Sequence, residues 1–204
     1  MTQQAARAKR GPYASGTARR AEILDAALAL FGEVGYHGAS LREIADRAGI
    51  SHTGLLRHFP NKSALLGATL AERERRIRSE FRLDEDRDPI DLLRDHIRVM
   101  ERNAALPGII ELYAVLSTEA AAPSHPAHDY FVTRFRAIRA HLTNTFTQLA
   151  AAGLLRPGLE PADAAIAVIS HADGLQVQWL LEPQAVDLGR VTRRFVQDLV
   201  TVPL

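Results

Sequence analysis

Hydrophobic positions recur at helical spacing along most of the chain. Apolar residues at intervals of three and four, bounded by capping residues and by Pro or Gly, predict helices near residues 17–34, 40–48, 51–59, 61–82, 89–104, 108–121, 126–152, 162–182 and 187–201. No segment alternates apolar and polar residues over the length of a strand. We therefore predict an all-α fold of about nine helices, in which a three-helix N-terminal domain precedes a C-terminal helical bundle.

The segment from Ser40 to Phe59 has the pattern of a helix-turn-helix. Ser40 is followed three residues later by Glu43, which is a capping box in which each side chain satisfies a backbone N–H of the other. Gly49 can adopt the left-handed conformation that ends a helix, and Ser51 can cap a second short helix. In a helix-turn-helix, that second helix enters the major groove of DNA.

The residues around this segment resemble a known family. From Ile23 to Leu66 the chain contains the Leu-Phe-x-x-x-Gly-Tyr segment, the Ala-Gly-Ile-Ser turn and the His-Phe-Pro-x-Lys segment in order, and is similar to the amino-terminal domain of the TetR (tetracycline-repressor-like) transcriptional regulators. Leu56 stands where the family usually has a phosphate-contacting Tyr. The resemblance implies a repressor that binds a palindromic operator as a dimer and is released by a small-molecule effector.

The resemblance also assigns DNA contacts. It places Ser40, Leu56, His58 and Lys62 at the phosphate backbone, and Arg42, His52, Thr53 and Arg57 near base edges. We complete the predicted DNA-binding set with Thr17, Arg20, Ser51 and Gly54. The missing side chain of Gly54 allows either a close approach to DNA or nothing more than a tolerated glycine in the first helical turn. Arginine alone among these residues has a strong base preference, because it can bind guanine with two hydrogen bonds.

Charge and composition agree with a partner that is double-stranded DNA. Residues 1–62 contain nine Lys or Arg against five Asp or Glu, whereas residues 63–204 contain sixteen against nineteen. The chain has no cysteine, which excludes Cys-ligated zinc and Cys nucleophiles. It also lacks an apolar run of the roughly 18–20 residues that a bilayer span needs and a signal-peptide core. We expect a cytoplasmic protein without a cofactor and without a membrane partner.

The pattern divides the chain into three parts. Residues 1–16 are predicted to be a disordered basic arm, which either follows the phosphate backbone or makes no contact. Residues 17–62 form the DNA-binding domain and residues 63–204 the effector-binding and dimerisation domain, with 63–82 as a connector helix. Its charged stretch AERERRIRSEF is interpreted as a solvated face held by the pairs Glu72/Arg76 and Glu74/Arg78.

The C-terminal domain is expected to hold the effector and to form the dimer. The resemblance implies an effector pocket, for which the candidate lining residues are His96, Met100, Tyr113, Leu116, Phe131, Phe135, His171 and Leu175. This lining favours an apolar or aromatic compound, although each residue can also be plain core. The penultimate helix has almost no charge except Asp173, and the last helix carries an apolar stripe. This pattern predicts a two-fold interface of Ala165, Ile169, Ala172, Gln176, Trp179, Val191, Phe195 and Leu199. The alternative is a penultimate helix that is central in a monomer.

Two other functions remain open. A helical metal-dependent enzyme would use His125, His128 and Asp129 of the HPAHDY segment, with His96 or His171 as a further ligand. No phosphate-binding loop, nucleophile elbow or HExxH motif supports an enzyme. The second alternative is a regulator without a small-molecule effector that is controlled by protein partners.

Overall fold

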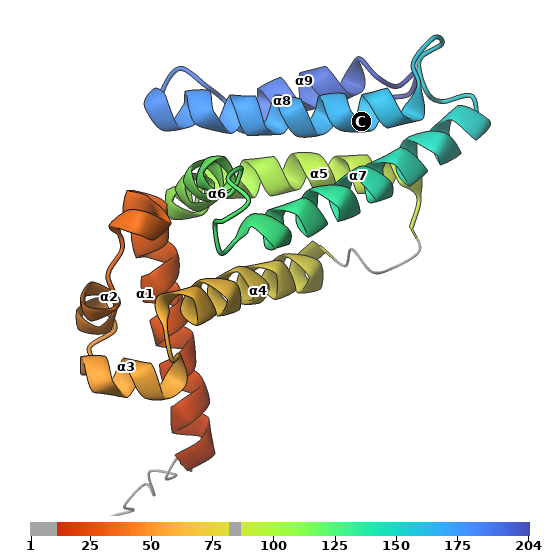
Figure 1. Ribbon diagram of the computed structural model, residues 1–204. Helices are drawn as coiled ribbons and strands as arrows, with labels where there is room; N and C mark the ends of the chain where they lie inside the picture. The colour runs from red at the N-terminus through yellow and green to blue at the C-terminus, as the bar shows by residue number, and fades with distance from the viewer. Residues whose placement is uncertain (1–11, 82–86) are drawn as a thin grey trace, which may run out of the picture.

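The chain folds entirely into helices over the part that the structure describes. The computed structural model describes residues 12–81 and 87–204, where nine helices and no strand are present. These are α1 (Pro12–Gly38), α2 (Leu41–Arg47), α3 (His52–His58), α4 (Lys62–Phe81), α5 (Pro89–Ala104), α6 (Pro107–Glu119), α7 (His128–Ala151), α8 (Pro161–Leu181) and α9 (Leu188–Gln197). The predicted all-α fold is confirmed. In Figure 1, α1–α3 form one end of the molecule and α8 and α9 the other.

Two helices differ from their predicted bounds by more than two residues. The first helix begins at Pro12 instead of Thr17, so residues 12–16 of the predicted disordered arm are helical, and residues 1–11 lie outside the described residues. Gly35 has a φ of 70° and bends this helix where we predicted its end, but the chain continues helically to Gly38. The last helix ends at Gln197 rather than near residue 201. Beyond it the backbone bonds the 154–156 segment, through Arg156 N to Leu199 O at 2.9 Å and Thr201 N to Leu154 O at 2.9 Å.

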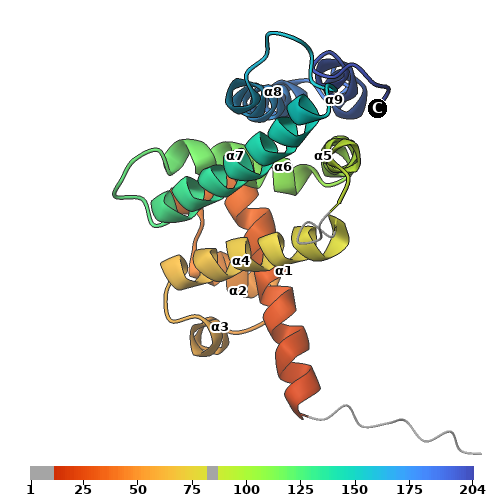
Figure 2. The same cartoon turned by 90° about the vertical axis from the view of Figure 1, so that its right-hand side faces the viewer.

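The end formed by α1–α3, which we expect to bind DNA and call the DNA-binding end, shares a hydrophobic core with the C-terminal bundle. Ile23 and Phe31 of α1, Ile44 of α2 and Leu55 of α3 are fully buried, and Leu112 of α6 lies in the same cluster. Helices α1 and α6 approach so closely that a Cβ atom on Gly32 would lie 2.7 Å from the carbonyl oxygen of Gly108. Figure 2 shows α1 running lengthwise from the DNA-binding end to α6. The predicted boundary between residues 62 and 63 is therefore bridged by packing.

Helix α8 buries one face and exposes another. Ala165 and Val168 are buried in the bundle, whereas Ile166, Val177 and Leu181 are 50%, 47% and 82% exposed. These three side chains follow one stripe, because their spacings of eleven and four residues return to the same side of a helix. Even with this composition, no helix in the described ranges is long and apolar enough to cross a membrane.

Candidate functional site

Local capping shapes the helix-turn-helix. Ser40 Oγ accepts a hydrogen bond from Glu43 N at 3.1 Å, and Ser51 Oγ accepts one from Gly54 N at 3.0 Å. Gly49 has the expected positive φ of 64°. The carboxylate of Glu43 bonds Arg47 at 3.0 Å, so within the described ranges only the first half of the predicted capping box is present. Arg47 also forms a two-point ion pair with Glu33, which ties α2 to α1.

The predicted base-reading side chains are all exposed to solvent. They are Arg42 on α2 and His52, Thr53 and Arg57 on α3. Leu56 is 37% exposed, while its neighbour Leu55 is fully buried. An exposed cationic surface beside a helix start suits a polyanion, since phosphates are bound by arginine side chains and by helix N-termini.

Lys62 is used inside the protein. Its ammonium group donates to the carbonyl oxygens of Tyr36 at 2.7 Å, Ala39 at 2.9 Å and His37 at 3.5 Å, and lies 4.5 Å from the centre of the Tyr36 ring. An ammonium group has three N–H donors, so none is left for a phosphate in this arrangement. This geometry weighs against the predicted phosphate contact of Lys62 and gives it the role of fixing the end of α1 against α4.

The other predicted DNA-binding residues have clear places in the fold. Arg20 is exposed on α1, with its guanidinium 5.2 Å from the centre of the Phe59 ring, so it lies beside the end of α3. Thr17 lies in α1, but its side chain is outside the described residues. A Cβ atom on Gly54 would lie 3.1 Å from Ser51 Oγ, which is tighter than ordinary contact. Gly54 therefore also makes room for the cap of α3, a reason that sequence reasoning missed.

A second candidate site is a cavity of about 340 Å³ among α4, α5, α6, α7 and α8. Its apolar wall includes Ile77, Met100, Phe131, Phe135 and Ile138. The volume is at the lower end of the range for small-molecule sites, which is roughly 300–1,000 Å³. Five of the eight predicted pocket residues line it, namely His96, Met100, Tyr113, Phe131 and Phe135.

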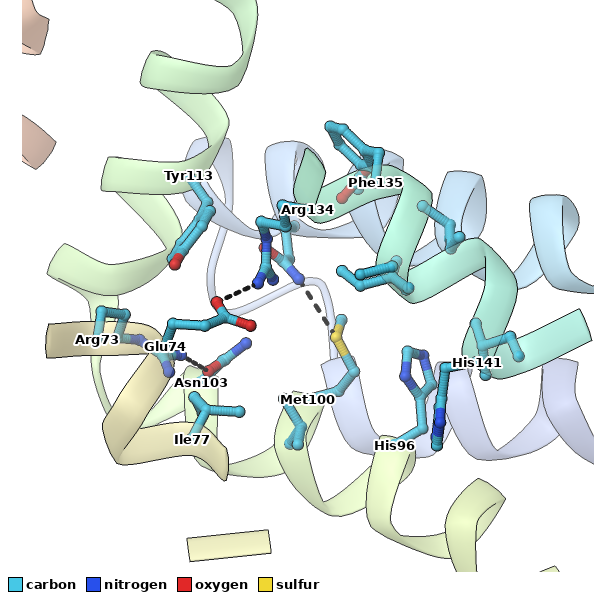
Figure 3. A pocket seen from close by; sticks show the side chains of 18 of the residues that line it. Arg73, Glu74, Ile77, His96, Met100, Asn103, Tyr113, Arg134, Phe135 and His141 are labelled. Carbon is cyan, nitrogen blue, oxygen red and sulfur yellow. Dashed lines mark hydrogen bonds and ion pairs between the residues drawn. The ribbon is translucent and has the colours of Figure 1, made fainter. Parts of the chain in front are cut away.

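Charged side chains gather at one end of this cavity. Figure 3 shows Arg73, Glu74 and Arg134 grouped near Tyr113. Arg134 Nη1 donates to Glu74 Oε2 at 2.7 Å, and the guanidinium carbons of Arg73 and Arg134 lie 5.8 and 4.6 Å from the centre of the Tyr113 ring. Arg73 Nη2 donates to Asn103 Oδ1 at 3.4 Å. The predicted pair between Glu74 and Arg78 is replaced by this interhelical pair, so this part of α4 is not a solvated face.

The other end of the cavity carries neutral histidines. His96 and His141 both line the cavity, and Figure 3 shows them on the side away from Tyr113. Burial, reinforced by the neighbouring His171 and His141, lowers the pKa of His96 to about 4. Burial also lowers the pKa of His141. At neutral pH these two imidazole rings are therefore uncharged.

Three predicted pocket residues are elsewhere. Leu116 is fully buried in the core between α1 and α6, and Leu175 packs in the cluster of Met100, Ile110 and Leu188. His171 stacks on Phe195 at a ring-centre distance of 4.1 Å. The helical register directs these side chains into packing contacts instead of the cavity. Sequence reasoning missed the polar lining residues Arg73, Glu74, Asn103, Arg134 and Asp173; only Asp173, the lone charge in an apolar segment, gave a signal.

The predicted dimer residues lie mainly on the inner faces of α8 and α9. Ala165 and Ala172 are 0% and 6% exposed, and Ile169, Ala172 and Gln176 line the cavity. Trp179, Val191, Phe195 and Leu199 are partly buried against the protomer's own clusters. In the single chain Ala165 and Ala172 face the interior, whereas Ile166, Val177 and Leu181 of the same helix are exposed.

The HPAHDY residues also take structural places. His125 accepts a hydrogen bond from Ala127 N at 3.1 Å and packs edge-on to Tyr36, and His128 Nδ1 lies 2.8 Å from Ala120 O. His96 lies in the cavity and His171 against α9. In the part of the chain that the structure describes, no three His, Cys, Asp or Glu side chains are grouped to hold a metal ion.

Comparison with known proteins matches both parts of the chain. Residues 23–69 match the model for bacterial regulatory proteins of the tetR family, and residues 111–201 match that for the BetI-type transcriptional repressor C-terminal domain. The HTH-type transcriptional regulator AcrR of Shigella flexneri is 29% identical over 195 residues, which are 91% of this chain and 89% of AcrR.

Two further similarities cover different lengths. The HTH-type transcriptional regulator RutR of Escherichia coli is 42% identical over 72 residues, which are 35% of this chain, so the match spans only 34% of RutR. The solved SmeT–triclosan complex superposes with a TM-score of 0.75 at 26% identity, over 91% of this chain and 95% of that chain, and SmeT is the repressor of a Stenotrophomonas maltophilia multidrug efflux pump. With an N-terminal and a C-terminal family match and this fold, the chain belongs to the TetR family of transcriptional regulators.

Proposed function

We propose that this protein is a ligand-responsive transcriptional regulator, most simply a repressor, that binds a palindromic operator as a dimer and leaves it when a small molecule fills the cavity. The observation that carries the proposal is the double role of α4. Lys62 at its start holds the end of α1, and Arg73 and Ile77 further along line the cavity. We propose that such a regulator acts in the cytoplasm, where it meets its operator.

Helix α4 can transmit a change in the cavity to the DNA-binding end. Eleven residues separate Lys62 from Arg73, about 17 Å at a rise of 1.5 Å per residue. A packed helix moves as a unit, since its side chains interlock with their neighbours on both sides. A ligand that displaces Arg73 or Ile77 would therefore move the anchor of α1 and the recognition helix connected to it.

Helix α6 supplies a second connection. Glu119 Oε2, at its end, accepts a hydrogen bond from Tyr36 N at 2.9 Å, next to the bend at Gly35. Tyr113 on the same helix lines the cavity. The bend of α1 is thus attached to two helices that both contact the ligand space.

The exposed stripe of α8 is the surface that we propose for dimerisation. Ile166, Val177 and Leu181 are large apolar side chains facing solvent in the single chain. A second copy related by a two-fold axis would cover them and hold two recognition helices at a set distance. A ligand then releases DNA only if it binds one spacing of these helices more tightly than the other.

The test is a fluorescence-anisotropy titration of the purified protein with its own upstream DNA. We expect binding that weakens steeply as salt rises, because phosphate contacts release counterions. A thermal-shift screen of metabolites then looks for a compound that stabilises the protein, as SmeT holds triclosan. That compound should also release the DNA. Salt-insensitive or absent DNA binding would overturn the proposal, and chemical turnover of the compound would favour an enzyme.

A further inference from the structure

The cavity contains a buried positive charge for which no carboxylate in residues 12–81 and 87–204 is a partner. Arg73 is 8% exposed, and its Nε atom is buried with no hydrogen-bond partner. Its bond to Asn103 Oδ1 is long, at 3.4 Å, and the partner is a neutral amide. Burial lowers the pKa of the Arg73 guanidinium, which reflects the cost of keeping it charged there. A buried charge is ordinarily paired, because removal from water costs several kcal/mol.

The described carboxylates that line the cavity do not supply that partner. Glu74 is bonded to Arg134, and Asp95 is bonded to Arg87 and Arg98. Asp173 on α8 makes no ion pair with Arg73; burial raises the pKa of its carboxyl, and the charge of Arg134 opposes this rise. The unmatched charge with the deepest burial is therefore positive.

The surroundings of Arg73 define the shape of a ligand group. A guanidinium presents its N–H donors in a planar fork that matches the two oxygens of a carboxylate. Asn103 accepts the bond from Arg73 with Oδ1, which leaves its NH₂ group as a further donor. Figure 3 shows both side chains at the end of the cavity that also holds Tyr113.

Away from Arg73 the cavity wall is mainly apolar, and the carboxylate of Asp95 in this wall is already paired with Arg87 and Arg98. Met100, Phe131, Phe135 and Ile138 form its apolar wall, and His96 at the far end is uncharged at neutral pH. A ligand with a charge at both ends would leave one charge against this wall. One anionic head and an apolar or aromatic body fit the space.

We propose that the effector is a monoanionic organic acid whose carboxylate pairs with Arg73 and the Asn103 amide, while its apolar body lies along Met100 and the aromatic wall. This inference rests on the proposed function only in taking the cavity to be the effector site. The acid supplies the missing counter-charge of Arg73. Binding therefore draws Arg73, and with it α4, toward the ligand.

The probe is a panel of aromatic and aliphatic monocarboxylates of six to twelve carbons, each accompanied by its primary amide and its amine. Thermal shift and calorimetric titration at pH 7.5 measure binding to the wild type. We expect carboxylates to stabilise the protein and to bind at least tenfold more tightly than their amides and amines. Amides or amines that bind equally well or better, or a panel in which no acid binds, would overturn the inference.

Variants of α4 test whether Arg73 is the residue that binds the carboxylate. Arg73→Met should reduce carboxylate affinity at least tenfold and remove the preference over amides, and Arg73→Lys should retain part of it because it keeps the charge without the fork. Arg75→Met is the matched control, since Arg75 is 68% exposed, pairs with Glu72 and is not part of the cavity. A carboxylate preference that persists in Arg73→Met contradicts the inference. If that variant does not fold, Arg73→Lys and the wild-type comparison decide.

The same samples separate this inference from the proposed function. Anisotropy with the upstream DNA is measured in parallel, without ligand. If the protein binds DNA but no organic acid, only the organic-acid proposal is contradicted. If the protein shows no salt-sensitive DNA binding, the proposed regulator function is contradicted, whether or not the acids bind.

Discussion

The DNA-binding end and the cavity use charged side chains in opposite ways. At the DNA-binding end, Arg42 and Arg57 are exposed on two short helices, each of which is capped locally by a serine. At the cavity, Arg73 and Arg134 come from helices about sixty residues apart, with Arg73 almost fully buried. Exposed charges remain available for a polyanion. Buried charges must be paired inside the protein or by a ligand, so they select ligands of the opposite charge.

The difference also concerns stability. An exposed ion pair contributes about 0–1 kcal/mol, whereas breaking a buried pair costs about 3–5 kcal/mol because one charge is left without a partner. Substitutions at the two ends should therefore have different effects. Those at the cavity should change folding stability, and those at the DNA-binding end should change only DNA affinity.

The largest effect is expected from Glu74→Gln, which removes the partner of Arg134 and leaves two guanidinium groups beside Tyr113. We expect a loss of about 3 kcal/mol in the free energy of unfolding, at the low end of the buried range because the two side chains are still 26% and 28% exposed. Urea denaturation measures this loss. Glu72→Gln, whose partners Arg75 and Arg76 are more exposed, is the control and should cost about 1 kcal/mol or less.

A pH titration tests the neutral end of the cavity. The pKa of His96 is lowered from 6.5 to about 4 in the folded protein, so the unfolded chain binds a proton first as the pH falls. The stability that this group contributes is complete above pH 6.5 and is lost as the pH falls toward the folded pKa. The loss is about 2 kcal/mol near pH 4.5. His96→Gln should flatten the curve of unfolding free energy between pH 6.5 and 4.5. Parallel curves for the two proteins would show that His96 titrates normally.

At the DNA-binding end, Arg42→Ala should weaken binding to the cognate operator by about 1–3 kcal/mol. Because Arg42 is exposed, its melting temperature should be unchanged. Anisotropy and thermal denaturation on the same sample measure both quantities. Arg139→Ala, an exposed arginine on α7 far along the chain, is the control that should keep full affinity. A loss of stability in Arg42→Ala would remove the contrast between the two ends.

The smallest effect is a gain. Leu56→Tyr adds a hydroxyl to a side chain that is 37% exposed, at the position where the resemblance places a phosphate contact. One added hydrogen bond contributes about 0.5–1.5 kcal/mol, so we expect operator affinity to rise by several-fold. The anisotropy titration measures it, with Leu56→Phe as the control without a hydroxyl. Equal affinities of the two variants would show that no phosphate lies within reach.

The charged residues of α4 also show what the sequence pattern did not predict. The mixed charges of α4 suggested pairing within the helix, and Glu72 with Arg76 does this at 2.8 Å. Glu74, two residues later, points to α7 instead and bonds Arg134. The sequence of α4 alone does not distinguish them, because the choice depends on which helix lies opposite.

The sequence by itself determined the features that depend on neighbours within one or two helical turns. Ser40 and Ser51 cap the helices that follow them, Gly49 has its positive φ, and Pro89 begins a helix that ends at Ala104 as predicted. Their partners are three or four residues away, so a short pattern contains the whole interaction.

Only the tertiary structure decided the orientation of each helix toward the others. It placed Ala165 and Ala172 inside and Val177 outside, turned Lys62 onto the end of α1, and brought Arg73 beside Asn103 without a carboxylate. These outcomes depend on contacts between residues more than twenty positions apart or on the rotation of a whole helix. An apolar helix such as α8 offers several faces of similar hydrophobicity, so packing against the other helices selects the buried one.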